Sequence, residues 1–301
     1  MPINLQAQAV DENREVFYIP NFVTEEEEGY LIRKIKDTPQ QRGMTVRSPS
    51  GCRYGASHPT KAHDLPLHSS NYVATGGQLT GKNVLLSQPL PPFVEVYPNI
   101  VDRLQSTGVF RASTHGAPNH IIVNEYLPGQ GIMPHQDGPA YHPVVATISL
   151  GTHTAFHYYK YTTGSQGQNA TEPRFEDVAR IIDPTPVMSV LLEPRSVVIT
   201  SGSLYTSYLH GQVYLTVFYR CAESCMDSIG NHIVDHFTAG IDDLHPPKFA
   251  DLDVTVANWR LLGGRDAKDA VINGGHLERG IRYSLTCRDV EKVANSALLG
   301  R

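Results

Sequence analysis

The sequence predicts a mainly β protein with flanking helices, built on a jelly roll or a related barrel. Several short apolar runs, interspersed with turn-forming Pro, Gly, Asn and Asp, follow residue 119, and no regular helices separate them. The chain also holds 25 glycines and 21 prolines in 301 residues, which suits a turn-rich β protein and disfavours a helical bundle. Because 40% of the residues are hydrophobic, a sizeable core can form.

Helices are expected in the first part of the chain. Thr24 and Glu27 make a capping-box pattern at the start of a predicted helix. Residues 38–83 are rich in Pro, Gly and Ser and are expected to form long loops. Apolar residues recur at helical spacing over residues 93–104, where Pro98 must kink or split the helix.

Strands are expected from residue 119 onward. The predicted strands are Ile121–Val123, Val144–Leu150, Ala155–Tyr161, Val187–Leu192, Val197–Thr200 and Ile281–Cys287. The last one is the clearest, because apolar and polar residues alternate along it. Period two puts Arg282 and Arg288 on one face, opposite the apolar side chains.

Charge and cysteine content limit the partners and the compartment. The formal net charge of −5 gives no overall basic field for nucleic acid, so such contact needs a local patch. Residues 33–53 offer one, with six basic residues against a single acidic one. The N-terminus lacks the apolar core of a secretory signal, and no apolar run reaches the length of a membrane helix. With four scattered cysteines, we expect a cytoplasmic or nuclear protein without membrane contact or obligate oligomerisation.

One constellation of residues indicates metal chemistry. His135-Gln136-Asp137 is a His-x-Asp pair, which by itself is expected by chance in a chain with 14 histidines. Two further motifs make a functional role for this pair more convincing. Asn124-x-Tyr126 precedes it after an apolar run, and His210 follows a series of predicted strands. Two histidines and one carboxylate form the facial triad of non-haem Fe(II) oxygenases, which leaves room for a keto acid and dioxygen. A dicarboxylate co-substrate then needs a cation, and the arginine strand supplies one.

In this order, Asn-x-Tyr, His-x-Asp, His and Arg-x-Ser-x-Thr-x-Arg resemble the AlkB family of Fe(II)/2-oxoglutarate-dependent dioxygenases. Residues 123–139 are most similar to the sixth eukaryotic branch of that family. The resemblance implies a double-stranded β-helix core, which is jelly-roll or cupin-like. It implies catalytic Fe(II) on His135, Asp137 and His210, and 2-oxoglutarate held by Asn124, Tyr126, Arg282, Ser284, Thr286 and Arg288. Ser284 departs from the family pattern, which usually has Asn there.

The resemblance also implies an activity. O2 and 2-oxoglutarate give succinate, CO2 and an iron-centred oxidant that hydroxylates a C–H bond, and on an N-methyl group this leads to demethylation. AlkB-type enzymes carry a substrate-recognition lid where this chain has residues 38–60, so Arg47, Arg53 and Tyr54 are the candidate contacts to RNA or DNA. Protein hydroxylases share the core chemistry, and the triad does not separate the two classes. A catalytically silent binding module is disfavoured, because it has no need for a complete triad.

The chain is expected to divide into three parts. Residues 1–118 would carry helices and recognition loops, residues 119–292 the dioxygenase core, and residues 293–301 a tail. Residues 211–280 form an expected insertion in the core. Within it, four residues have ligand types for structural zinc, although their central spacer is short for a zinc finger: Cys221, Cys225, His232 and His236. The sequence leaves open whether Cys221 is instead a buried strand residue.

Overall fold

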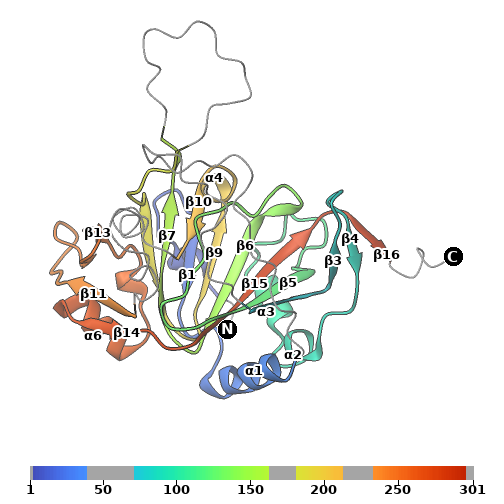
Figure 1. Cartoon of the computed structure of the whole chain (residues 1–301), viewed down its shortest axis with the longest axis horizontal. Coiled ribbons are helices and arrows are strands. Elements are labelled where there is room, and N and C mark those ends of the chain that lie inside the picture. Colours follow the sequence, from blue (N-terminus) through green and yellow to red (C-terminus); the bar gives the residue numbers. More distant parts are fainter. Residues whose placement is uncertain (1–2, 39–70, 163–180, 213–232, 296–301) are drawn as a thin grey trace, which may run out of the picture.

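The computed structural model describes residues 3–38, 71–162, 181–212 and 233–295. At its centre lies a six-stranded antiparallel sheet in the order β1-β9-β6-β15-β5-β2 (Figure 1). The strand bounds are Val16–Ile19 (β1), Val197–Ser201 (β9), Tyr141–Leu150 (β6), Arg282–Val290 (β15), His120–Tyr126 (β5) and Asn71–Thr75 (β2). The predicted mainly β class is therefore confirmed.

A second, three-stranded sheet packs face to face against the β1-β9 side of the first. Its order is β10-β7-β8, with bounds Leu209–Gly211, Thr154–Tyr159 and Met188–Leu192. One buried apolar cluster joins the two sheets, and the Tyr158 hydroxyl lies 2.7 Å from the Thr200 hydroxyl between them. Two facing antiparallel sheets are the jelly-roll arrangement that the sequence predicts.

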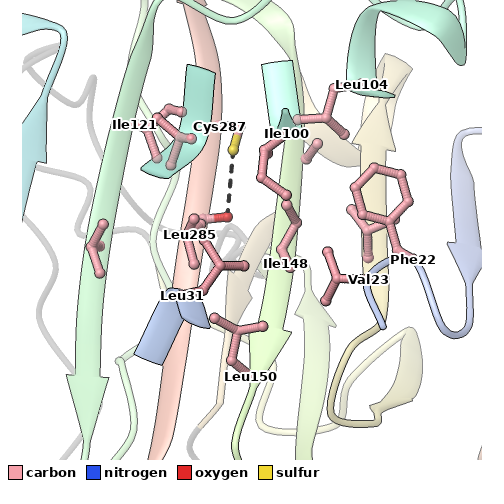
Figure 2. Packing of buried hydrophobic residues seen from close by; sticks show 14 of the residues in the cluster. Phe22, Val23, Leu31, Ile100, Leu104, Ile121, Ile148, Leu150, Leu285 and Cys287 are labelled. Carbon is pink, nitrogen blue, oxygen red and sulfur yellow. Dashed lines mark hydrogen bonds between the residues drawn. The ribbon is translucent and has the colours of Figure 1, made fainter. Parts of the chain in front are cut away.

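The outer face of the six-stranded sheet is covered by three helices, α1 (Glu25–Asp37), α2 (Pro92–Glu95) and α3 (Ile100–Ser106). Alternation along β15 explains this packing, because Leu285 and Cys287 face the helices while their neighbours face the other way. Figure 2 shows these two side chains among Leu31 of α1 and Ile100 of α3. Pro98 separates α2 from α3, so the predicted split of the 93–104 helix is confirmed.

Helix α1 begins with the predicted capping box. The Thr24 hydroxyl accepts from the Glu27 backbone N–H at 3.2 Å, and the Glu27 carboxylate accepts from the Thr24 N–H at 2.8 Å. Arg103 of α3 donates to the same carboxylate, so one acidic side chain caps α1 and joins it to α3. The hydrogen bonds from Arg103 hold the pKa of Glu27 below its ordinary value, against a smaller opposing effect of burial.

Glu27→Gln is expected to lower the free energy of unfolding by about 1 kcal/mol at neutral pH, because the amide keeps the cap but loses the ion pair to a partly exposed arginine. A carboxyl group with a lowered pKa stabilises the fold above its unfolded pKa, and this contribution is lost as the pH falls through the folded value. Urea unfolding from pH 7 down to about pH 3 should therefore show the two proteins converging in acid. A gap that persists there would contradict the ion-pair explanation.

Part of the expected loop region is ordered as strands. Within residues 38–83, β2 pairs with β5, and β3 (Gly77–Leu79) pairs with β4 (Leu85–Ser87), which pairs in turn with β16 (Val293–Asn295). The prediction of loops is wrong for β2 and β3. Gly76 and Gly77 have positive φ and interrupt the strand pattern between β2 and β3. β2 is defined by its pairing with the distant strand β5, and β3 by its pairing with the neighbouring strand β4.

Residues 233–280 form a four-stranded antiparallel sheet and a helix between β10 and β15. The sheet order is β13-β12-β11-β14, with bounds Val254–Thr255, Lys248–Phe249, Val234–Thr238 and His276–Glu278, and the helix is α6 (Arg265–Asn273). Buried Glu193 connects this unit to the core, since it accepts from the Gly263 and Gly264 N–H groups at 2.9 and 2.7 Å and from the Tyr18 hydroxyl at 2.7 Å.

The smaller elements complete the described structure. The 3-10 helices are η1 (Leu5–Gln8) and η3 (Trp259–Leu261), and α4 (Gly202–Thr206) follows β9. None of the helices in the described ranges is long and apolar enough to cross a membrane.

Candidate active site

Three ligand-type side chains meet between the two main sheets. His135 and Asp137 lie on the loop between β5 and β6, and His210 lies on β10. His135 and His210 pair through their backbones, with N–O distances of 3.0 and 2.9 Å. The Asp137 Oδ1 atom lies 4.0 Å from His135 Nε2 and 3.8 Å from His210 Nε2. The structure thus brings together the three residues predicted to bind iron, with their ligand atoms within 4.8 Å of one another.

The loop reaches β10 closely because residue 211 is glycine. A Cβ atom at Gly211 would lie 2.8 Å from the Pro134 nitrogen and 2.9 Å from the Ile132 oxygen. Any larger residue would therefore push away the backbone that carries His135. His210 is a candidate metal ligand, and Gly211 leaves the space that the β5-β6 loop needs to approach β10.

The two histidines are held in the form that binds metals. Burial lowers the pKa of His210 to about 3 and also lowers the pKa of His135, so both imidazoles are neutral at ordinary pH. The His135 Nδ1 atom lies 2.8 Å from the Met133 carbonyl oxygen, which can only accept. The proton therefore sits on Nδ1, and the lone pair of Nε2 faces the other two ligands. Phe156 stacks on the His210 ring at 5.6 Å between ring centroids and fixes its plane.

Asp137 shows that the site is built for a cation. Burial raises the pKa of its carboxyl group, but Arg288 and the two histidines outweigh burial and lower it overall. Oδ1 pairs with Arg288, while Oδ2 is buried and has no hydrogen-bond partner among the described residues. An unpaired buried carboxylate oxygen is unfavourable unless a cation completes it. Two neutral histidines and this carboxylate fit a divalent iron ion.

A polar stripe runs along one face of the six-stranded sheet toward these ligands. Register places Arg282 opposite Tyr126, and Ser284 opposite Asn124 on one side and Ser149 on the other. Directly opposite residues share a face in an antiparallel pair, so the predicted 2-oxoglutarate residues of β5 and β15 line one surface. Thr286 belongs to the same stripe and lies opposite Ile122.

Arg282 has the features of an anion-binding group. Its side chain is buried, and one Nη donates to the Ser149 hydroxyl at 2.8 Å. Within the described ranges, its Nε and other Nη have no hydrogen-bond partner. The guanidinium carbon lies 5.4 Å from the centre of the Tyr126 ring. Burial lowers the pKa of Arg282 to about 10, which still leaves it charged at neutral pH. Two unused donors on a buried cation fit a carboxylate.

Arg288, at the other end of β15, contacts a carboxylate of the protein itself. It pairs with Asp137 and lies over the Tyr141 ring at 4.8 Å. Tyr141 stacks in turn on His120, whose pKa burial lowers to about 4. The sequence predicts that both arginines share a face, but it does not reveal that Arg288 joins the metal ligand. Tyr141 and His120 were not predicted for the site, and no local motif marks them.

Several predicted residues lie outside the described ranges. These are the candidate nucleic-acid contacts Arg47, Arg53 and Tyr54, and the candidate zinc ligands Cys221, Cys225 and His232. The fourth candidate, His236, is exposed on β11 beside His276, with ring centroids 5.9 Å apart. In the described ranges, the only cluster of three or more potential metal ligands is the His135, Asp137 and His210 set.

The chain is similar to several known proteins. It is 28% identical over 283 residues to the Danio rerio protein "Probable RNA/DNA demethylase ALKBH6". The aligned region covers 94% of this chain and 88% of that protein. The solved structure of OsALKBH1 matches with a TM-score of 0.40 and 17% identity, over 91% of this chain and 98% of the other. A Pseudomonas putida prolyl-4-hydroxylase matches with a TM-score of 0.41 and 9% identity, over 95% and 99% of the two chains.

The predicted resemblance to the AlkB family is confirmed by the similarity to the zebrafish protein. A family model described as "2OG-Fe(II) oxygenase superfamily" matches residues 15–213, which is well over half of the chain. Fe(II), 2-oxoglutarate and O2 are the cofactor and co-substrates of that family, so their prediction is also confirmed. This protein therefore belongs to the 2OG-Fe(II) oxygenase superfamily.

Proposed function

We propose that this enzyme is an AlkB-type dioxygenase that oxidises, and thereby demethylates, a nucleic-acid substrate. The observation that carries the proposal is the similarity over 94% of the chain to a protein named as a probable RNA/DNA demethylase. The local excess of basic residues at 33–53 also supports a nucleic-acid substrate, although the net charge of the whole chain is negative.

In this proposal, His135, Asp137 and His210 hold Fe(II). The Nδ1–H of His135 donates to Met133, so Nε2 is always presented to the ion. Arg288 keeps Asp137 ionised and restrains the side chain that provides the carboxylate ligand. Phe156 excludes water from one face of His210. These contacts prepare the ligands before the metal arrives, which reduces the cost of binding it.

Arg282 binds the far carboxylate of 2-oxoglutarate through its two unused donors. Tyr126 lies beside Arg282, with the guanidinium carbon 5.4 Å from the ring centre, and lines the same pocket. Asn124 and Thr286 belong to the same polar stripe, and Arg288 lies at its metal end. When bound, Fe(II) with 2-oxoglutarate and O2 supplies the oxidant that hydroxylates a C–H bond, and succinate and CO2 are released. An N-hydroxymethyl product then loses formaldehyde.

Turnover of the wild-type enzyme tests the proposal. Purified protein is incubated with Fe(II), 2-oxoglutarate, O2 and N-methylated RNA or DNA oligonucleotides, and succinate and formaldehyde are measured. We expect formaldehyde to depend on the methylated oligonucleotide. Succinate without any nucleic-acid-dependent formaldehyde, together with hydroxylation of a protein substrate, would replace the proposal with a protein hydroxylase.

Nucleic-acid binding is expected to weaken steeply with salt, because Lys and Arg side chains that bind phosphates release counterions. Arg47→Gln/Arg53→Gln is expected to reduce the slope of log affinity against log salt by about 0.7 for each single-strand phosphate that is no longer neutralised. Fluorescence anisotropy with a labelled oligonucleotide at several salt concentrations measures this slope.

The matched control for that measurement is Arg260→Gln/Arg265→Gln. It removes two exposed arginines that pair with Asp243 and Asp269 in the insertion. The control should keep the wild-type slope. A slope that does not respond to the changes at Arg47 and Arg53, or that is flat in the wild type, would remove these residues from the interface.

A further inference from the structure

The insertion contributes a buried ion cluster at the edge of the 2-oxoglutarate pocket. Asp235 on β11 is fully buried, and its two oxygens accept from Nε and Nη2 of Arg279 at 2.7 Å each. The same carboxylate lies 3.0 Å from Nε2 of His153, which precedes β7 in the core. The Arg279 side chain is only 6% exposed. The insertion is therefore anchored to the jelly roll by the contact between Asp235 and His153 and not only by apolar packing.

A small pocket that is partly open to solvent adjoins this cluster. Its lining includes the buried residues Arg282, Tyr126 and Gln212, together with Arg279 and Gly280 at the end of the insertion. Both full charges in the lining are positive, on Arg279 and Arg282, and no acidic residue belongs to the lining. In the part of the chain that the structure describes, the buried Gln212 Oε1 and two donors of Arg282 have no hydrogen-bond partner. The cavity thus combines a positive potential with unused polar groups, which fits a small dicarboxylate.

The two arginines are close enough to influence each other. Burial is the main reason that the pKa of Arg282 falls to about 10, and the charge of Arg279 lowers it further. Asp235 lies behind Arg279, since it is fully buried and does not line the cavity. The ion pair is therefore oriented with its positive end toward the cavity. An anion in the cavity would meet two guanidinium groups, and the balancing carboxylate lies farther away.

We propose that the insertion forms the outer wall of the 2-oxoglutarate pocket, where Arg279, held from behind by Asp235, supplies a second positive charge that strengthens binding of the dicarboxylate. This inference rests on the proposed function of the same site. It gives residues 233–280 a role that the sequence leaves open. Because Arg279 lies three residues before Arg282, one short segment carries both cations from the insertion into the core strand.

An electrostatic role and a purely structural role of the Asp235–Arg279 pair predict different effects of two single variants on 2-oxoglutarate binding. Arg279→Gln removes the positive end and leaves the negative one, so the affinity for 2-oxoglutarate is expected to fall about tenfold. Asp235→Asn removes the negative end while its amide oxygen still accepts from Arg279, so the affinity is expected to stay equal or increase. The double variant removes the oriented pair and should bind more weakly than wild type but more tightly than Arg279→Gln. A purely structural role would weaken binding in both single variants.

The experiment is anaerobic calorimetry of 2-oxoglutarate binding to the full chain loaded with Mn(II) in place of Fe(II), with thermal melts as the test of folding. A second ligand, 2-oxopentanoate, has a methyl group where 2-oxoglutarate has its far carboxylate, so its affinity should not respond to Arg279→Gln. Arg260→Gln is the matched control, because it removes an exposed arginine of the insertion that pairs with Asp243, and it should bind as wild type. If Arg279→Gln does not fold, the double variant Asp235→Asn/Arg279→Gln replaces it, because it leaves no unpaired charge at these two buried positions.

The outcomes separate this inference from the proposed function. Wild-type protein that binds no 2-oxoglutarate would overturn both. Wild-type binding that is unchanged in Arg279→Gln, or equally weakened for 2-oxopentanoate, would overturn the role of Arg279 and leave the dioxygenase function intact. Weaker binding of both Asp235→Asn and Arg279→Gln would reduce the cluster to a structural anchor. Only the charge-ordered series with an unaffected monocarboxylate supports the proposal.

Discussion

His135→Ala is expected to lower the affinity for Fe(II) by about 100-fold or more and to abolish 2-oxoglutarate-dependent succinate formation. Loss of a supporting residue around a metal typically lowers affinity about 10- to 100-fold, and loss of one of three direct ligands should exceed that. Because the His135 side chain is about a fifth exposed and lies on a loop, its removal opens no core cavity. The free energy of unfolding of the metal-free protein should change by less than about 1 kcal/mol.

Metal binding and turnover measure this prediction together. Calorimetric titration with Mn(II) gives the affinity of the site without redox chemistry, and mass spectrometry gives the succinate formed with Fe(II). His245→Ala is the matched control, because this histidine is exposed, lies in the insertion and pairs only with nearby Asp242 in the described contacts. The control should bind metal and turn over as wild type. Unchanged metal affinity in His135→Ala would show that the ion binds elsewhere.

The sequence predicts the strands of the jelly roll well where burial determines their pattern. The runs at residues 144–150 and 197–200 become the central and neighbouring strands β6 and β9, and each pairs on both edges. A strand that is buried on both faces consists of continuous apolar residues, which a single sequence displays plainly. Among the described strands, the edge strand β2 pairs with β5 alone, and it has no such pattern, so the sequence predicts a loop there.

In the candidate site too, residues that belong to local sequence motifs could be predicted, whereas contacts between distant segments could not. The His-x-Asp pair is local, and His210 follows a recognisable run of strands, so all three members of the candidate metal site could be proposed from the sequence. The partner of Arg288 could not, because only the pairing of β15 with β6 and the path of the β5-β6 loop bring Asp137 to it. The same holds for Arg279, whose partner Asp235 lies 44 positions earlier and reaches it through the pairing of β11 with β14.

Arg288→Met is expected to lower the free energy of unfolding of the metal-free enzyme by about 3–5 kcal/mol. Methionine keeps most of the volume of the side chain, but it leaves the buried Asp137 carboxylate without its cation. Among the described residues of the wild-type protein, only the Oδ1 oxygen of this carboxylate has a hydrogen-bond partner, and that partner is Arg288. The variant also removes the guanidinium from the face of the Tyr141 ring, which adds a smaller cost.

A bound divalent cation should reverse most of this loss, because it places positive charge on the same carboxylate. Saturating Mn(II) is therefore expected to raise the melting temperature of Arg288→Met more than that of wild type. The double variant Arg288→Met/Asp137→Asn contains neither buried charge, so its metal-free form should recover much of the lost stability and should not respond to Mn(II). Chemical unfolding with and without Mn(II) measures all three proteins. An Arg288→Met protein as stable as wild type without metal would show that Asp137 is neutral in the apo site, and the ion pair would then have no part in preparing the ligand.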